Sequence, residues 1–83
     1  MQNEILKWKG RLSEFTRKNK RIDIEADGLI ISIRDILDPY TDDLKDINTD
    51  KALIYSEILN NLRKEYLENI QKIKELSEAI GED

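Results

Sequence analysis

The sequence predicts an all-α fold, a long antiparallel helical hairpin of the coiled-coil type that makes up residues 1–83 as a single domain. Two observations predict it. Apolar residues recur alternately three and four positions apart in both halves of the chain, which is the pattern of a heptad seam. A segment around the single proline, Pro39, separates the two halves. We therefore expect one helix over about 3–38, a turn over 39–48 and a second helix over about 49–80.

Each predicted helix has one apolar seam with one polar interruption. The seam of the second helix is interrupted at Asn69 and consists of Ala52, Tyr55, Leu59, Leu62, Tyr66, Ile73, Leu76 and Ile80. The seam of the first is interrupted at Asn19 and consists of Ile5, Trp8, Leu12, Phe15, Ile22, Ala26, Leu29, Ile33 and Ile36. When the halves are laid antiparallel, the residue numbers of every facing pair give the same sum, and Asn19 then faces Asn69. A buried Asn costs stability unless another amide meets it, so we expect these two side chains to pair and to fix the register.

The segment Arg17 to Gly28 has a second interpretation. Its apolar residues alternate with acidic ones, as they would along a short half-buried strand: Ile22, Asp23, Ile24, Glu25, Ala26 and Asp27. The seam continues in phase from Phe15 to Leu29, which favours a helix. A three-helix arrangement with a break near Asn19 remains an alternative to the simple hairpin.

Local signals define the ends of the helices. Asn3 is a candidate cap for the first helix, and the residue before Pro39 disfavours helical backbone, so the helix should end near Leu37. Asn48 or Thr49 can cap the second helix, and Gly81 suits its left-handed end. Between the helices, one helical turn is expected to open at Thr41, Asp42 and Asp43. Gly10 and Gly28 are weak points of the first helix on its solvent side.

The composition argues against catalysis. The chain has no cysteine and no histidine, so it has neither a thiolate metal site nor the usual neutral-pH acid–base group. We find no glycine-rich phosphate loop and no activated nucleophile. We therefore expect no enzyme activity and no cofactor. With 39% charged residues and no apolar run long enough for a membrane span, we expect a cytoplasmic protein without a membrane partner.

The net charge of −4 conceals a strong polarity along the chain. Residues 1–21 contain seven basic against two acidic side chains, a net charge of +5. Residues 22–50 contain two basic against nine acidic side chains, a net charge of −7. In a hairpin the turn end is therefore acidic, and the first helix is basic towards the open end.

Apolar residues outside the seam predict further association. In the heptad frame five of them fall along one flank of the hairpin, and a single hairpin would leave them in water: Ile30, Leu37, Leu53, Leu67 and Ile70. Two hairpins packed flank to flank would bury them in a four-helix bundle. We therefore expect a homodimer with these residues at the interface.

The resulting functional prediction is a small non-catalytic protein-interaction module, such as an adaptor, assembly factor or inhibitor, that acts as a homo-oligomer. Its protein partner, which the sequence does not identify, is expected near the turn, on Leu37, Tyr40, Asp42, Asp43 and Leu53.

An alternative is a nucleic-acid-binding regulator, because clustered basic residues release counterions from nucleic acid and aromatic residues stack on bases. Trp8 and Phe15 would supply the stacking, although both lie on the seam. The basic side chains for this alternative are Lys7, Lys9, Arg11, Arg17, Lys18, Lys20 and Arg21.

One further stretch, Asp46 to Glu57, resembles a calcium-binding EF-hand loop. Oxygen ligands occupy its positions one, three and five, and Glu57 occupies position twelve. Position six is Lys51 instead of the glycine that the loop's sharp turn requires, and position nine is Ile54 instead of an oxygen donor. Helix capping by Asn48 and Thr49 is the competing interpretation.

Overall fold

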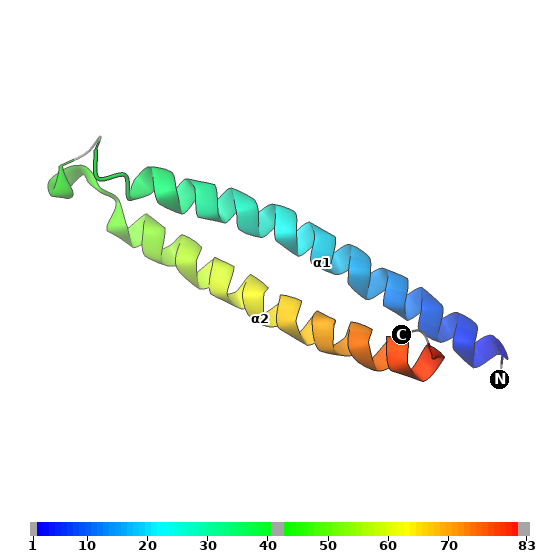
Figure 1. The fold of residues 1–83 in the computed structure, drawn as a ribbon. Coiled ribbons are helices and arrows are strands. Elements are labelled where there is room, and N and C mark those ends of the chain that lie inside the picture. Colours follow the sequence, from blue (N-terminus) through cyan, green and yellow to red (C-terminus); the bar gives the residue numbers. More distant parts are fainter. Residues whose placement is uncertain (1, 41–42, 82–83) are drawn as a thin grey trace.

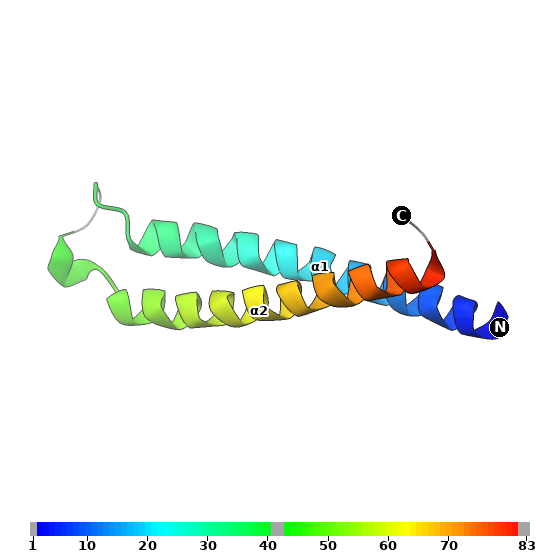
Figure 2. The same cartoon turned by 60° about the horizontal axis from the view of Figure 1, so that its bottom comes forward.

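The computed structural model describes residues 2–40 and 43–81 and confirms the predicted helical hairpin. Helices α1 (Gln2–Ile36) and α2 (Thr49–Ile80) run side by side in opposite directions, and a short 3-10 helix, η1 (Leu44–Asp46), lies in the connection between them (Figures 1 and 2). The start of α1 and the end of α2 lie together at the open end. With extents of 63 × 18 × 15 Å, the molecule is a rod two helices thick.

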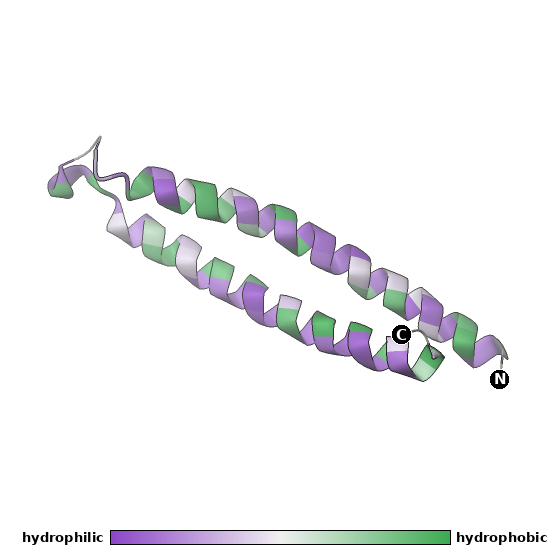
Figure 3. Ribbon diagram, in the orientation of Figure 1, coloured by the Kyte–Doolittle hydropathy of each residue, from purple (hydrophilic) through white to green (hydrophobic). Residues whose placement is uncertain are grey.

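The predicted seam lies between the helices. Ile22 and Ala52 are buried, and so are the two polar interruptions, Asn19 and Asn69. The remaining seam residues are half-buried, apart from Ile5 at the start of α1. Hydrophobic and hydrophilic bands alternate along both ribbons, as expected when each helix buries only one stripe (Figure 3). The apolar core is therefore one row of side chains deep.

Helix α1 is continuous through Asn19 and through the alternating segment from Arg17 to Gly28. The three-helix alternative is therefore wrong for this chain. The heptad phase determines the backbone here, because Ile22 reaches the seam in a helix whereas Ile24 points outward, with 7% and 74% of their surfaces exposed. A strand would have placed both on the same face.

The ends of the helices agree with the local signals except at the start. Helix α1 begins at Gln2, so Asn3 lies inside its first turn and is not the residue that precedes the helix. At its other end, the amide of Leu37 donates to the Ile33 carbonyl at 3.0 Å. Gly81 ends α2 in the left-handed conformation, with φ of 83°.

The connection begins with a tight turn in which the amide of Tyr40 donates to the Asp38 Oδ1 at 2.9 Å. Asp43 precedes η1 but makes no side-chain capping bond, and the predicted helical turn at Thr41 and Asp42 lies outside the described residues. Asn48 caps α2, since its side chain accepts a hydrogen bond from the Lys51 amide at 3.0 Å. Neither long helix, within its described residues, is apolar enough over a sufficient length to cross a membrane.

Candidate functional site

A pair of buried amides, Asn19 on α1 and Asn69 on α2, joins the two helices; the residues are 7% and 6% exposed. The Nδ2 of Asn69 donates to the Oδ1 of Asn19 at 2.8 Å, and the Nδ2 of Asn19 donates to the Tyr66 carbonyl at 3.3 Å. No buried side-chain nitrogen or oxygen within the described ranges lacks a hydrogen-bond partner. The predicted facing pair is confirmed. Because any slip of the helices would leave both amides against apolar neighbours, the pair fixes the register.

The first flank, as we call it, is the side of the hairpin that carries Ile30, Leu37, Leu53, Leu67 and Ile70. These five residues are 43–60% exposed, as the sequence predicted for a single hairpin. Exposed apolar residues scattered singly need no explanation, whereas several along one side of a small protein are typical of a protein-binding surface. The first flank is therefore the first candidate for association.

The opposite side of the seam, which we call the second flank, carries a groove that the sequence analysis missed. Gly28, Leu29 and Ser32 of α1 and Tyr55 and Ile58 of α2 line it together with one charged residue, Glu25, around a volume of about 460 Å³. Ile58 is 43% exposed at its edge. The groove exists because two residues one helical turn apart, Gly28 and Ser32, present almost no side chain to the seam's edge. Two small residues one helical turn apart beside the seam are the feature of the sequence that could have predicted this groove.

The groove continues along the second flank towards the open end. A hollow of about 210 Å³ adjoins it at Glu25 and reaches Lys18 and Arg21, and a third hollow of about 280 Å³ is lined by Glu14, Arg17 and those same two basic residues. The second flank therefore changes from mostly apolar near the turn to charged near the middle of the rod, where acidic side chains (Glu14, Glu25 and Glu65) lie among the basic ones.

Of the seven basic residues proposed for nucleic acid, the structure gathers Arg17, Lys18 and Arg21 around one hollow. Helical spacing places Lys7 and Arg11 along the same side of α1, whereas Lys9 and Lys20 fall on the first-flank side. Lys18 is also engaged, because its Nζ lies 3.6 Å from Glu14 and 5.2 Å from the centre of the Phe15 ring. The predicted basic segment is thus divided between two sides of the helix.

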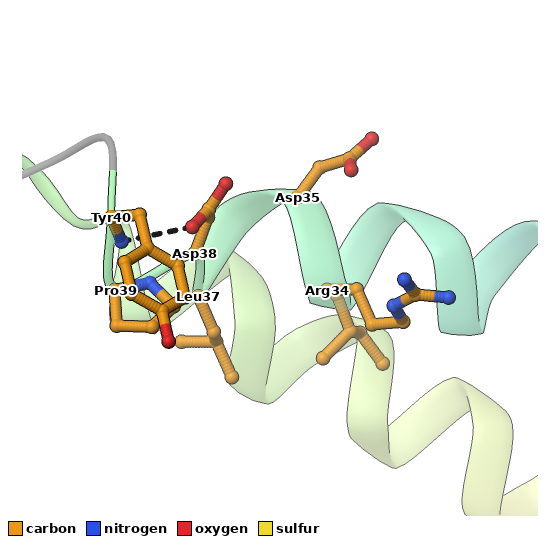
Figure 4. A pocket seen from close by; sticks show the side chains of 7 residues that line it. Arg34, Asp35, Leu37, Asp38, Pro39 and Tyr40 are labelled. Carbon is orange, nitrogen blue, oxygen red and sulfur yellow. Dashed lines mark hydrogen bonds between the residues drawn. The ribbon is translucent and has the colours of Figure 1, made fainter.

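The turn end presents apolar and acidic side chains to solvent. Tyr40 is 94% exposed, Leu37, Asp43 and Leu53 are also exposed, and Asp42 lies outside the described residues. Figure 4 shows Leu37, Pro39 and Tyr40 around a shallow hollow of about 480 Å³, which Ile33, Arg34, Asp35 and Asp38 complete. Leu44 of η1 is 81% exposed, and the sequence analysis did not single it out. The turn end therefore offers a small apolar surface within an acidic region.

The stretch from Asp46 to Glu57 does not have the conformation of an EF-hand loop. It leaves η1 at Asp46, and from Thr49 onward it is the first part of α2. The side-chain oxygen of Asn48, which would be the ligand at position three, accepts the capping bond from Lys51 instead. A helix cannot wrap its ligands around one ion as the loop does, so the capping interpretation is the correct one here.

Comparison with protein-family models, with curated proteins and with solved structures gives no match for this chain. The surfaces of the hairpin are therefore the basis for inferring its function.

Proposed function

We propose that this chain is a small non-catalytic protein-interaction module that works as a pair of helical hairpins. The observation that carries the proposal is the exposure of the five apolar residues of the first flank, at 43–60% in the single hairpin. Completing the burial of a Leu or Ile side chain removes apolar surface from water, and this is the main favourable contribution to most protein association. A rod whose own core is one side chain deep gains stability from any partner that covers this surface.

The strength of association can be estimated from the same side chains. Full burial of one Leu or Ile contributes ~1.5–3 kcal/mol, and about half of that remains to be gained at each of the five in each of the two copies, so a pair of hairpins gains roughly 8–15 kcal/mol. Since association itself costs several kcal/mol, additional contacts are needed for a tight complex. We therefore expect pairing of hairpins that depends on concentration over the micromolar range.

The turn end supplies the surface for a different protein. Tyr40 and the acidic Asp43 are exposed there and lie outside the first flank, whereas Leu37 and Leu53 belong to both surfaces. The chemistry that fits is an apolar protein surface bordered by Lys or Arg side chains. A pair of hairpins would present two such ends, which is a typical arrangement for an adaptor or assembly factor.

The proposal is tested by the solution mass, measured by light scattering after size exclusion over a tenfold range of concentration. We expect a mass that rises from one chain towards two. Leu67→Glu with Ile70→Glu tests the first flank, and Lys64→Glu on the outer face of α2 is its control because it changes the net charge by the same amount. A single-chain mass at every concentration, unchanged by either variant, contradicts the proposal.

The alternative function, nucleic-acid binding, has less support. Trp8 and Phe15, the aromatic residues available to stack on bases, are half-buried in the seam. The basic residues around them occupy two sides of α1, and Lys18 is paired with Glu14. These observations favour the protein-interaction module.

A further inference from the structure

Gly28 has no role in the packing of the hairpin itself. A Cβ built on it meets nothing within 4 Å, so the groove beside it has room for a larger side chain. A glycine inside a helix lowers helix stability relative to alanine. The benefit that a glycine offers at such a position is close approach of another backbone. The groove at Gly28 and Ser32 therefore leaves room for the backbone of another helix to come close.

The charges on either side of Gly28 identify the second helix. Arg21 lies seven residues before Gly28 and Asp35 seven residues after it; Lys18 lies ten before and Asp38 ten after. If two copies of α1 lie antiparallel with Gly28 at the centre, Arg21 of each copy is level with Asp35 of the other, and Lys18 is level with the segment just beyond the end of α1 that contains Asp38. Figure 4 shows the side chains of Asp35 and Asp38 pointing to the same side of the end of α1.

Helix α2 repeats this arrangement. In the register that the Asn19–Asn69 bond fixes, Gly28 is level with Asn60. Lys51 lies nine residues before Asn60 and Glu68 eight residues after it, so these two charges also face each other in an antiparallel pair of hairpins. In a parallel pair, each charged residue would instead lie beside the same residue of the other copy, which carries a like charge.

Most of these groups are free to pair between chains. Among the described residues, Arg21, Asp35, Lys51 and Glu68 have no ion-pair partner within 4.0 Å. Lys18 does have one, Glu14 at 3.6 Å, but both side chains are about half exposed, at 46% and 57%, and such a pair within one helix is weak. Within the described part of the chain, the hairpin thus leaves Arg21, Asp35 and Glu68 without an ion pair, whereas the Nζ of Lys51 lies 5.6 Å from the centre of the Tyr55 ring.

We infer that the groove on the second flank is covered by a second copy of this chain, which lies antiparallel about a two-fold axis at Gly28. The inference rests on the proposed pairing of hairpins and places their contact on the second flank instead of the first. Overlap from Lys18 to Asp38 is about 30 Å long. On a rod 18 Å wide this covers roughly 500 Å² of each copy, close to the lower limit of a specific interface. Self-association on the second flank engages Asp35 at the edge of the turn-end hollow and leaves the first flank for a different protein.

The first test replaces the glycine. In the dimer, Gly28→Leu places two bulky side chains at the two-fold axis, one from each copy. Gly10→Leu makes the same replacement in the same helix but away from the groove. Both glycines have open space around them in the single hairpin, so both variants should fold. We expect the dimer Kd, measured by sedimentation equilibrium, to rise at least ~tenfold for Gly28→Leu and to stay unchanged for Gly10→Leu.

The second test exchanges a pair of charges. Arg21→Glu should weaken the dimer several-fold at low salt, and Arg21→Glu with Asp35→Arg should restore it. Residues 21 and 35 are about 21 Å apart along one helix, so the restoration cannot arise within a single chain. Asp35→Arg alone serves as the matched control and should weaken the dimer as Arg21→Glu does.

The outcomes separate this inference from the proposed function. If the dimer Kd is unchanged by Gly28→Leu and by the charge variants, but the dimer is lost with Leu67→Glu and Ile70→Glu, the inference is wrong. The proposed interaction module then remains, with its self-association on the first flank. A chain that is monomeric at every concentration overturns both.

Discussion

Asn69 donates its side-chain amide to Asn19 across the hairpin at 2.8 Å, in the middle of a seam that is otherwise apolar. This bond, together with the bond from Asn19 to the Tyr66 carbonyl, makes one register of α1 against α2 better than its neighbours. An apolar seam alone would tolerate a shift by a whole heptad, because Leu, Ile and Ala are similar at every step. The amides supply specificity more than stability.

Replacing both amides, Asn19→Leu with Asn69→Leu, should raise the melting temperature, because a buried polar pair is exchanged for apolar packing. The same change should loosen the choice of register and oligomer. Thermal melting followed by circular dichroism and the solution mass measure the two effects. Asn19→Leu alone leaves the Asn69 amide unpaired and should cost about 1–3 kcal/mol. If the double variant is as unstable as the single one, apolar side chains cannot replace the amide pair, and the pair contributes to stability as well as to register.

Ile22→Ala and Ile24→Ala form a matched pair of variants, two residues apart in the same helix. Ile22 is 7% exposed in the seam, so its truncation should lower the free energy of unfolding by about 2–5 kcal/mol, towards the lower end because the core is thin. Ile24 is 74% exposed, and its truncation should change that free energy by about 0.5 kcal/mol or less. Urea unfolding measures both. Equal losses would contradict the outward position of Ile24.

Asn48→Ala removes the oxygen that accepts the Lys51 amide at the start of α2. We expect a loss of about 1 kcal/mol in the free energy of unfolding. Asn48→Asp should retain most of the stability, since aspartate accepts the same bond. Thr49→Ala, one residue later, is the control for changes in helix propensity. A loss at Thr49 that equals the loss at Asn48 would show that the capping bond does not stabilise the hairpin.

Nucleic-acid binding makes a separate prediction. If the hairpin is a protein-interaction module, a mobility-shift assay with duplex or single-stranded DNA or RNA should show no complex that survives a rise to physiological salt, where non-specific phosphate contacts lose most of their affinity. Lys18→Glu with Arg21→Glu is the diagnostic variant. A salt-resistant complex that this variant abolishes would favour the regulatory alternative over the proposed function.

The seam, its register and three of the four long-helix ends follow from the sequence because each depends on local spacing. Two periodic stripes, one Asn in each and a proline between them leave few ways to fold a chain of this length. The start of α1 could not be located this way, since Asn3 suits the first turn as well as the position before it. The connection was also hard to predict, because its short 3-10 helix depends on the path of the backbone between the two helix ends.

The groove on the second flank shows the limit of apolar patterns. Gly28 and Ser32 have no large apolar side chain, so a search for apolar patterns assigns both to the solvent-facing side of the helix. What matters at these positions is the space that their small side chains leave beside Tyr55 and Ile58. This space can be recognised only when α2 is placed alongside α1, since both helices line the groove.

The N-terminal turns of α1 have no part of α2 beside them. In the observed register Trp8 is level with Ile80, so the first turns of α1 extend beyond the other helix (Figure 1). Ile5 and Leu6 there are 38% and 66% exposed. Helical turns without a packing partner open readily, whereas backbone near the buried Ile22 opens only with the whole fold. Among the amide hydrogens of α1 and α2, those of residues 3–7 should therefore exchange with deuterium fastest. The two helices should separate progressively, from the open end towards the turn.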